Sequence, residues 1–345
     1  MVTVRAFTSG DELLLTDAWN RSMPADPTTA GWLRDCVLLD PNFDPEGLRV
    51  AVADGQVAGC AYAVRRRTPL APGTDLEPDT GWIPFFFVTP EHRGSGLGRR
   101  LLGEAVAFLK GHGRTRIDFA SYTPNYVLPG ADAELYPDGF RLLTGLGFRT
   151  LYSPVAMDRT LVGYVTPGEV HDLRAKRVSE GYEFRPPTEG ELPELIRFAA
   201  DAFNPDWGEA IRQHRDTKRM IIAKRESESE SESESEGEGE GEGESERGTE
   251  WGSGGAGAHG RIVGFALYAA YRGIPERFGP FGVDEGERGT GLGKILLHLT
   301  MTMMRAEGLH SSWFLWTGEA SPAGHLYTRA GYEITRRFHV MRLEA

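Results

Sequence analysis

The sequence predicts two tandem α/β domains of similar construction, and three observations support this fold class. The chain has 345 residues, a length that suits two domains of roughly 150 to 170 residues better than a single core. Strand-like and helix-like hydrophobic patterns alternate along both halves. A unit of strand, Gly-rich loop and helix recurs with an offset of 195 residues, which indicates an internal repeat of domain size.

Each half also contains a pair of neighbouring apolar runs typical of antiparallel strands. In the first half the runs 48–54 and 56–64 meet at Asp54-Gly55, a strong hairpin signal. In the second half the runs 219–224 and 261–270 are separated by a long insertion. Because the cost of loop closure grows only logarithmically with length, a surface hairpin tolerates such an insertion. We therefore expect the same strand pair in both halves.

The insertion at about 226–259 is predicted to be disordered, because it has almost no apolar groups to bury. From Glu226 to Glu246 it alternates Glu with Ser or Gly and holds eleven glutamates, so it accounts for nearly all of the formal net charge of -12. The rest of the chain is close to neutral, and we expect no nucleic-acid partner. We interpret this acidic insertion as a spacer that has no function of its own. The alternative is an arm that docks a partner.

The remaining composition predicts a cytoplasmic protein without a membrane partner. The two cysteines, Cys36 and Cys60, lie in apolar surroundings and lack metal-like spacing with histidine, so we expect buried thiols in a reducing compartment and no metal site. The N-terminus has no secretory pattern, and the apolar run 82–88 is too short to span a bilayer.

The repeated loop has the composition of a phosphate site. The segments 93–99 and 288–294 read R-G-S-G-L-G-R and R-G-T-G-L-G-K, and each lies between a strand and an amphipathic helix. A Gly-rich turn at a helix N-terminus presents unpaired N–H groups and the positive end of the helix dipole to an anion. Neither common nucleotide motif fits, because Arg99 replaces the third Gly of a dinucleotide fingerprint, and Arg288 and Ile295 replace essential positions of a Walker loop.

The pattern R-x-x-G-x-G after a strand that ends in Val resembles the acetyl-CoA-binding motif of the GNAT superfamily of N-acetyltransferases, and it occurs once in each half. The resemblance implies two tandem GNAT domains, each a mixed twisted β-sheet flanked by helices, with acetyl-CoA as cosubstrate and direct attack of an amine on the thioester. It implies cofactor-binding roles for Val88, Arg93, Gly94, Ser95, Gly96, Leu97, Gly98 and Arg99, and for Val283, Arg288, Gly289, Thr290, Gly291, Leu292, Gly293 and Lys294.

A second family mark, a tyrosine four residues before Gly-Phe or Gly-Tyr, occurs only in the second half. There Tyr327 precedes Gly331-Tyr332, and by resemblance it would protonate the departing CoA thiolate as general acid. The first half has Leu143 at the equivalent place, and leucine cannot donate a proton. We therefore expect catalysis in the C-terminal domain. The alternatives are an N-terminal domain active through Tyr126 or Tyr136, and a non-enzymatic acyl-CoA sensor.

The predicted domains span residues 1–165 and 181–345, with a linker at 166–180. The acceptor is expected to be a small-molecule or peptide amine. The tandem architecture is similar to that of the mycothiol synthases, but no residue pattern selects their substrate, and Ala320 stands where the family often has Asn. The general base stays open between water and several side chains, namely Glu276, Asp284, Glu285, Glu319 and His325.

Overall fold

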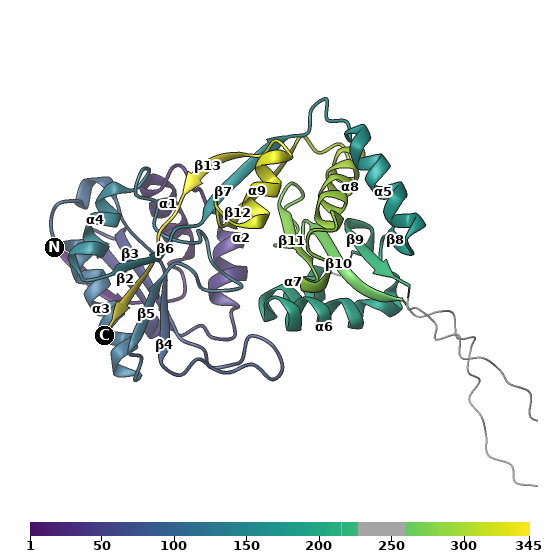
Figure 1. Ribbon diagram of the computed structural model, residues 1–345. Helices are drawn as coiled ribbons and strands as arrows, with labels where there is room; N and C mark the ends of the chain where they lie inside the picture. Colours follow the sequence, from purple (N-terminus) through teal and green to yellow (C-terminus); the bar gives the residue numbers. More distant parts are fainter. Residues whose placement is uncertain (215, 227–259) are drawn as a thin grey trace, which may run out of the picture.

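The computed structural model describes residues 1–214, 216–226 and 260–345. Apart from Glu226, the predicted acidic insertion lies outside these residues. The described chain forms two α/β halves side by side, with the N-terminal half on the left of Figure 1 and the C-terminal half on the right. Both chain ends lie on the N-terminal half (Figure 1).

The first half of the chain contains seven of the described strands. The strands are β1 Val2–Ala6, β2 Leu48–Ala53, β3 Gln56–Val64, β4 Thr80–Val88, β5 Arg116–Phe119, β6 Arg149–Tyr152 and β7 Val155–Thr160. The helices are α1 Glu12–Ser22, α2 Ala30–Leu33, η1 Arg34–Leu38, η2 Pro45–Gly47, η3 Pro90–His92, α3 Leu97–Gly111, α4 Pro137–Gly145 and α5 Gly168–Ser179. The predicted hairpin of β2 and β3 is confirmed, and the expected linker at 166–180 is largely helix α5.

The second half repeats this order. Its strands are β8 Tyr182–Arg185, β9 Met220–Arg225, β10 Arg261–Tyr268, β11 Phe278–Val283, β12 Ser311–Thr317, β13 Glu333–Arg337 and β14 Val340–Glu344. Its helices are η4 Glu189–Glu191, α6 Leu192–Ala202, α7 Pro205–His214, η5 Thr217–Arg219, η6 Glu285–Glu287, α8 Leu292–Ala306 and α9 Pro322–Arg329. The two strands that flank the insertion, β9 and β10, pair antiparallel as predicted.

Helices cover both faces of each sheet, because the strands alternate their side chains between two apolar cores. In β3, Ala61 and Ala63 contribute to the core under α3, whereas Cys60 and Tyr62 contribute to the core under α1 and α2. In the C-terminal half, α8 covers one face of β9 and β10, and α6 and α7 cover the other. Each Gly-rich loop therefore connects a strand of a sheet to a helix that packs on the same sheet.

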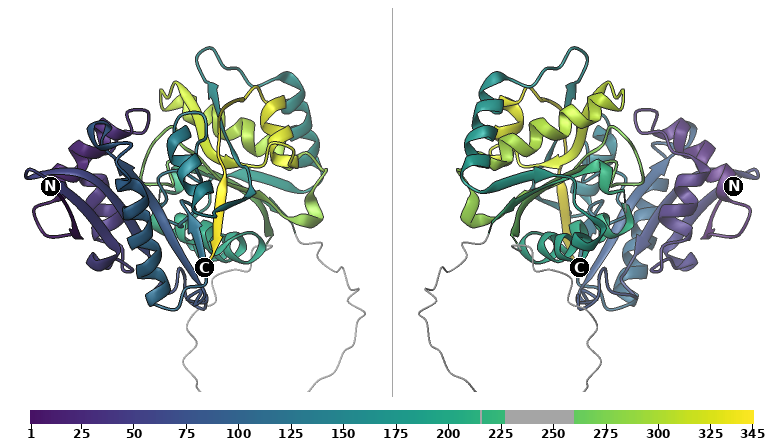
Figure 2. Two further views of the ribbon diagram at one scale, coloured as in Figure 1. Left: turned by 90° about the vertical axis from the view of Figure 1, so that its left-hand side faces the viewer. Right: turned by 90° about the vertical axis from the view of Figure 1, so that its right-hand side faces the viewer.

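The two halves exchange strands, which the sequence did not predict. In the described residues the N-terminal sheet has the order β1-β2-β3-β4-β5-β14-β6, so the last strand of the chain lies between β5 and β6. Conversely, β7 from the first half lies between β12 and β13. The yellow chain in Figures 1 and 2 shows this crossing from the C-terminal half to the N-terminal half.

Candidate functional site

Strand β4 separates from its neighbour β5 part-way along its length. The parallel pairing joins Thr80–Ile83 to Arg116–Phe119, and the segment 84–88 continues past the end of β5. Pro84 lies at this point and has no N–H to donate. The open side of β4 therefore leaves room for a ligand beside the strand, directly before the Gly-rich loop.

A large cleft, which we call the N-terminal cleft, occupies this opening. Its volume is about 770 Å³, and its lining comes from segments 22–25, 84–88, 92–99, 119–120, 127–132 and 135–143. It is thus bordered by the Gly-rich loop, the free side of β4, the end of α1 and the chain before and within α4. A cleft of this size is within the range of small-molecule and cofactor sites.

The Gly-rich loop at one end of the cleft has the geometry expected of an anion site. Gly94 and Gly96 have φ values of 73° and 82°, which favour glycine, and Gly96 precedes the first turn of α3. An added Cβ at either glycine would meet no heavy atom within 4 Å, so the backbone of the loop is open to a ligand. The N-terminus of α3 faces this loop and favours a bound phosphate.

The two arginines of this loop differ in their surroundings. Arg93 donates from Nη2 to the carbonyl of Ser22 at 2.9 Å and from Nε to the carbonyl of Val88 at 3.2 Å, so it ties the loop to α1 and β4. Arg99 is exposed in the first turn of α3 and lines the cleft. Arg99 is therefore better placed than Arg93 to reach a phosphate of a ligand.

The equivalent loop of the C-terminal half is covered by helix α5 at Thr290 and Gly291, whereas Gly289 stays open. A Cβ at Gly291 would lie 2.8 Å from Cδ2 of Leu173. Arg177 donates from Nε to the carbonyl of Thr290 at 2.8 Å, and Lys294 pairs with Glu169 at 2.6 Å. The positions that are open around Gly96 are thus filled around Gly291 by side chains of α5.

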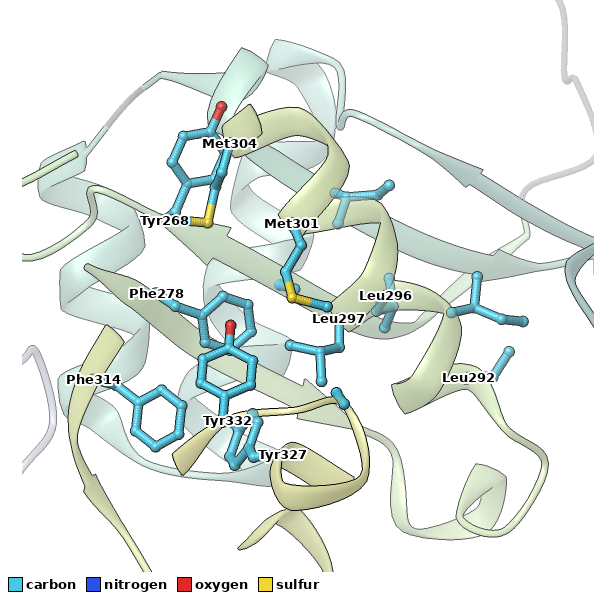
Figure 3. Close-up of a cluster of buried hydrophobic side chains, with 14 of the residues drawn as sticks. Tyr268, Phe278, Leu292, Leu296, Leu297, Met301, Met304, Phe314, Tyr327 and Tyr332 are labelled. Carbon is cyan, nitrogen blue, oxygen red and sulfur yellow. The ribbon is translucent and has the colours of Figure 1, made fainter. Parts of the chain in front are cut away.

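The aromatic core of the C-terminal half contains Tyr327, which is 7% exposed (Figure 3). Its ring centroid lies 4.4 Å from that of Phe314, 5.6 Å from that of Tyr332 and 6.0 Å from those of Phe278 and Phe281. Burial, with a smaller contribution from Tyr332, raises the pKa of the Tyr327 phenol well above its usual range. A phenol with a raised pKa is a weaker proton donor than one in water.

Comparison with known proteins identifies the family. The profile of the Acetyltransferase (GNAT) family matches residues 14–127 and, a second time, residues 214–332. The chain belongs to the acetyltransferase (GNAT) family. It is an acyltransferase with two GNAT domains, and this confirms the tandem α/β fold and the family predicted from the repeated loop. No sequence among curated proteins matches the chain.

Three solved structures are similar to this chain in shape. A glucosamine N-acetyltransferase region of a fungal multi-domain β-N-acetylglucosaminidase is 17% identical with a TM-score of 0.74, covering 99% of this chain and 38% of that one. A GCN5-related N-acetyltransferase from Sphaerobacter thermophilus is 19% identical with a TM-score of 0.68, covering 99% and 95%. A tandem GNAT protein from the clavulanic acid biosynthesis pathway is 14% identical with a TM-score of 0.60, covering 100% and 98%.

The structure places the predicted cofactor residues of the two GNAT domains in equivalent positions but unlike surroundings. Val88 and Val283 end β4 and β11, and both loops lead into long helices. The N-terminal set, apart from Ser95, lines the N-terminal cleft. In the C-terminal set, Thr290, Gly291 and Lys294 contact side chains of α5. The cofactor role of either set and the acid role of Tyr327 stay predictions.

Tyr126 and Tyr136, the tyrosines considered for catalysis in the N-terminal GNAT domain, lie in different parts of the structure. Tyr136 lines the N-terminal cleft, and its hydroxyl donates to Oδ2 of Asp26 at 2.5 Å. Burial and this hydrogen bond raise the pKa of Tyr136. Tyr126 instead lies at the contact between the two halves, where it packs against Trp316 and accepts a hydrogen bond from Arg277 at 2.7 Å.

Among the candidate bases of the C-terminal GNAT domain, three carboxylates have cationic partners. Asp284 pairs with Arg261, Glu285 with Arg288 and Glu319 with Arg337. Sequence reasoning missed His92, which lines the N-terminal cleft with Nδ1 2.9 Å from Oγ1 of Thr89. Its place directly before Arg93, the first residue of the loop motif, was the available signal.

Two further findings concern the described residues. In 1–214, 216–226 and 260–345, no group of three or more His, Cys, Asp or Glu side chains is arranged to hold a metal ion. Not one of the helices in these ranges combines the length and apolar character needed to cross a bilayer.

Proposed function

We propose that this GNAT protein transfers an acetyl group from acetyl-CoA to an amine and that the transfer takes place in the N-terminal cleft. The observation that carries the proposal is the cleft itself, because one continuous space of about 770 Å³ joins the open Gly-rich loop to the free side of β4. This choice takes up the N-terminal alternative, whereas the tyrosine motif alone favoured the C-terminal GNAT domain.

The residues of the cleft fit the parts of an acyl-CoA molecule. The loop at Gly94–Gly96 and the N-terminus of α3 would hold the pyrophosphate through backbone N–H groups, with Arg99 as a cationic partner. The segment 84–88 would hold the pantetheine arm beside β4. Backbone N–H groups on this free side are suited to stabilise the oxyanion that develops when an amine attacks a thioester.

Proton transfer in this site does not need a residue at the place of Tyr327. A thiol titrates near ~8.5, so a thiolate leaves more readily than an alkoxide and depends less on a proton donor. Leu143, at the equivalent place, is buried in the core under α3. Tyr136 keeps its proton at neutral pH and donates a hydrogen bond to Asp26, so water is the simplest final carrier of the amine proton.

The proposal predicts different outcomes for two residues that occupy equivalent places in the repeat. Arg99→Gln should raise the KM for acetyl-CoA by about tenfold, because a charge-assisted hydrogen bond contributes roughly 1.5 kcal/mol. Lys294→Gln should leave this KM unchanged within a factor of two, since Lys294 already pairs with Glu169. Steady-state kinetics with a saturating amine measures both values.

A third variant tests the tyrosine directly. Tyr327→Phe keeps the ring in its aromatic cluster and removes only the hydroxyl, so kcat should stay within a factor of two if transfer occurs in the N-terminal cleft. A kcat lowered by tenfold or more, together with an effect of Lys294→Gln and none of Arg99→Gln, would return the reaction to the C-terminal GNAT domain.

A panel of candidate amines can identify the acceptor. The panel should contain small aliphatic and aromatic amines, peptides with a free N-terminus and amino sugars, including glucosamine because a structure of similar shape is a glucosamine N-acetyltransferase region. Release of free thiol from acetyl-CoA reports transfer. The same panel with longer acyl-CoAs tests whether the N-terminal cleft is selective for the acetyl group.

A further inference from the structure

Arg336 belongs to the C-terminal half of the chain but reaches the wall of the N-terminal cleft. It lies on β13, which pairs with β7. Its Nη1 and Nη2 donate to the two carboxylate oxygens of Asp26 at 2.6 and 3.0 Å, and its Nε donates to Oδ2 of Asp132 at 2.8 Å. One guanidinium therefore joins two carboxylates that are 106 residues apart in the sequence.

Each of these carboxylates organises a different wall of the cleft. Asp26 follows segment 22–25 and accepts the hydroxyl of Tyr136, while its carbonyl accepts Nε1 of Trp19 at 2.8 Å. Asp132 lines the cleft and accepts the backbone N–H groups of residues 134 and 135 through Oδ1. Arg336 thus ties the end of α1 to the turn that precedes α4.

The two carboxylates stay close together only because the positive charge of Arg336 lies between them. The side chains of Asp26 and Asp132 are 11% and 2% exposed, and that of Arg336 is 18% exposed. Without a cation, two nearly buried carboxylates would face each other across the gap that Arg336 fills. Like charges in a site of low dielectric repel strongly, and an unpaired buried charge is unfavourable. The two walls would separate, or one aspartate would take up a proton.

The position of the tie within the cleft indicates which ligand it serves. The Gly-rich loop and α3 form one end of the cleft, where the phosphates of the cosubstrate are proposed to bind. The walls joined by Arg336 include Ser22, which accepts a hydrogen bond from Arg93 of this loop. The hydrogen bonds of Arg336 itself go to Asp26 and Asp132 and not to the loop. We take the acceptor amine to enter the cleft between the two walls that Asp26 and Asp132 hold.

We propose that Arg336 is a positioning residue that sets the width of the acceptor end of the N-terminal cleft. The C-terminal GNAT domain then contributes to acceptor binding in the N-terminal GNAT domain through this side chain. The inference rests on the proposed function, because it assumes that the amine enters the N-terminal cleft.

The test is a comparison of Michaelis constants for the two substrates. Arg336→Gln in the full chain should raise the KM for the best amine of the panel by tenfold or more, and should change the dissociation constant of CoA, measured by isothermal titration, by less than twofold. Arg336→Lys should give an intermediate KM, since an ammonium group pairs with one carboxylate but lacks the planar fork that joins both.

Two nearby arginines provide matched controls. Arg337→Gln breaks the exposed pair with Glu319 on the same strand, and Arg342→Gln breaks the pair with Asp118 in the exchanged strand β14. Both variants should keep the wild-type KM for the amine. If they raise it as much as Arg336→Gln does, the effect belongs to the strand crossing in general and the proposal is wrong.

A milder substitution distinguishes an effect on acceptor positioning from a general loss of folding. Tyr136→Phe removes only the hydroxyl that donates to Asp26, and it should raise the KM for the amine several-fold at an unchanged melting temperature. Equal losses of amine and CoA affinity in Arg336→Gln, or an unchanged KM for the amine, would overturn the inference. Failure of the proposed function has a different signature, namely an effect of Lys294→Gln without one of Arg99→Gln.

Discussion

Asp206 is a buried residue whose charged form is opposed by its surroundings. Its side chain lies at the start of α7 and is 5% exposed, and its Oδ1 has no hydrogen-bond partner among the described protein atoms. Burial raises the pKa of this carboxyl to about 6, although Arg277 and Arg66 act in the opposite direction. The folded protein therefore binds this proton more tightly than the unfolded chain does.

This residue gives a pH dependence with a defined sign. The stabilising contribution of the protonated Asp206 is fully present below the ordinary pKa of 3.8 and is lost as the pH rises through about 6. The total change is roughly 3 kcal/mol. In Asp206→Asn this dependence should disappear, so the free energy of unfolding relative to wild type should rise between pH 4.5 and pH 7. Urea unfolding at both pH values measures it, and a pH-independent difference would contradict the prediction.

At the scale of elements, each of the exchanged strands β7 and β14 contributes buried side chains to the core of the half that it joins. Met341 of β14 is 1% exposed and packs in the core under α3, whereas Met157 of β7 is 2% exposed and packs in the core under α8. Each methionine thus supports a domain built mainly from the other half of the sequence.

Matched truncations of these methionines should destabilise opposite domains. Met341→Ala and Met157→Ala should each lower the free energy of unfolding by about 2 to 5 kcal/mol, because each leaves a cavity in a packed core. Hydrogen exchange locates the effect. It should become faster in β5 and β6 for Met341→Ala and in β12 and β13 for Met157→Ala. Faster hydrogen exchange confined to the mutated residue's own half of the sequence would argue against a structural role for the swapped strands.

The loops show how far local sequence predicts an element. The Gly-rich segments correctly predicted a strand, a turn and a helix start in both halves, because these features depend on residues within one turn of each other. The covering of the second loop by α5 was not predicted. It depends on Leu173 and Arg177, which lie more than 100 residues before the loop.

At the scale of the whole molecule, the exchange makes two domains into one folding unit. The sheet β1-β2-β3-β4-β5-β14-β6 and the sheet β12-β7-β13 each contain a strand from the other half, and each exchanged strand has a partner on both sides. A domain separated at the predicted boundary would lose a central strand and gain an unpaired one. Backbone groups that lose their partners in a buried sheet strongly disfavour folding.

The two GNAT domains should therefore unfold together. Differential scanning calorimetry of the full chain should give one transition whose calorimetric enthalpy equals the van't Hoff enthalpy, as two-state unfolding requires. Residues 1–165 and 181–345 expressed separately should each fail to give a cooperative transition. Two resolved transitions in the full chain, or a stable isolated half, would show that the exchanged strands are dispensable.

The sequence by itself determined the repeat, the hairpins, the two phosphate-type loops and the family, because each depends on spacing and residue types within short segments. Only the tertiary structure decided which strand enters which sheet, which loop stays open and what Arg336 and Asp206 contact. The physical reason is the repeat itself. Equivalent strands in the two halves carry the same local signals, so their partners are chosen by packing between residues far apart in the chain, as the pairing of β14 with β5 and β6 illustrates.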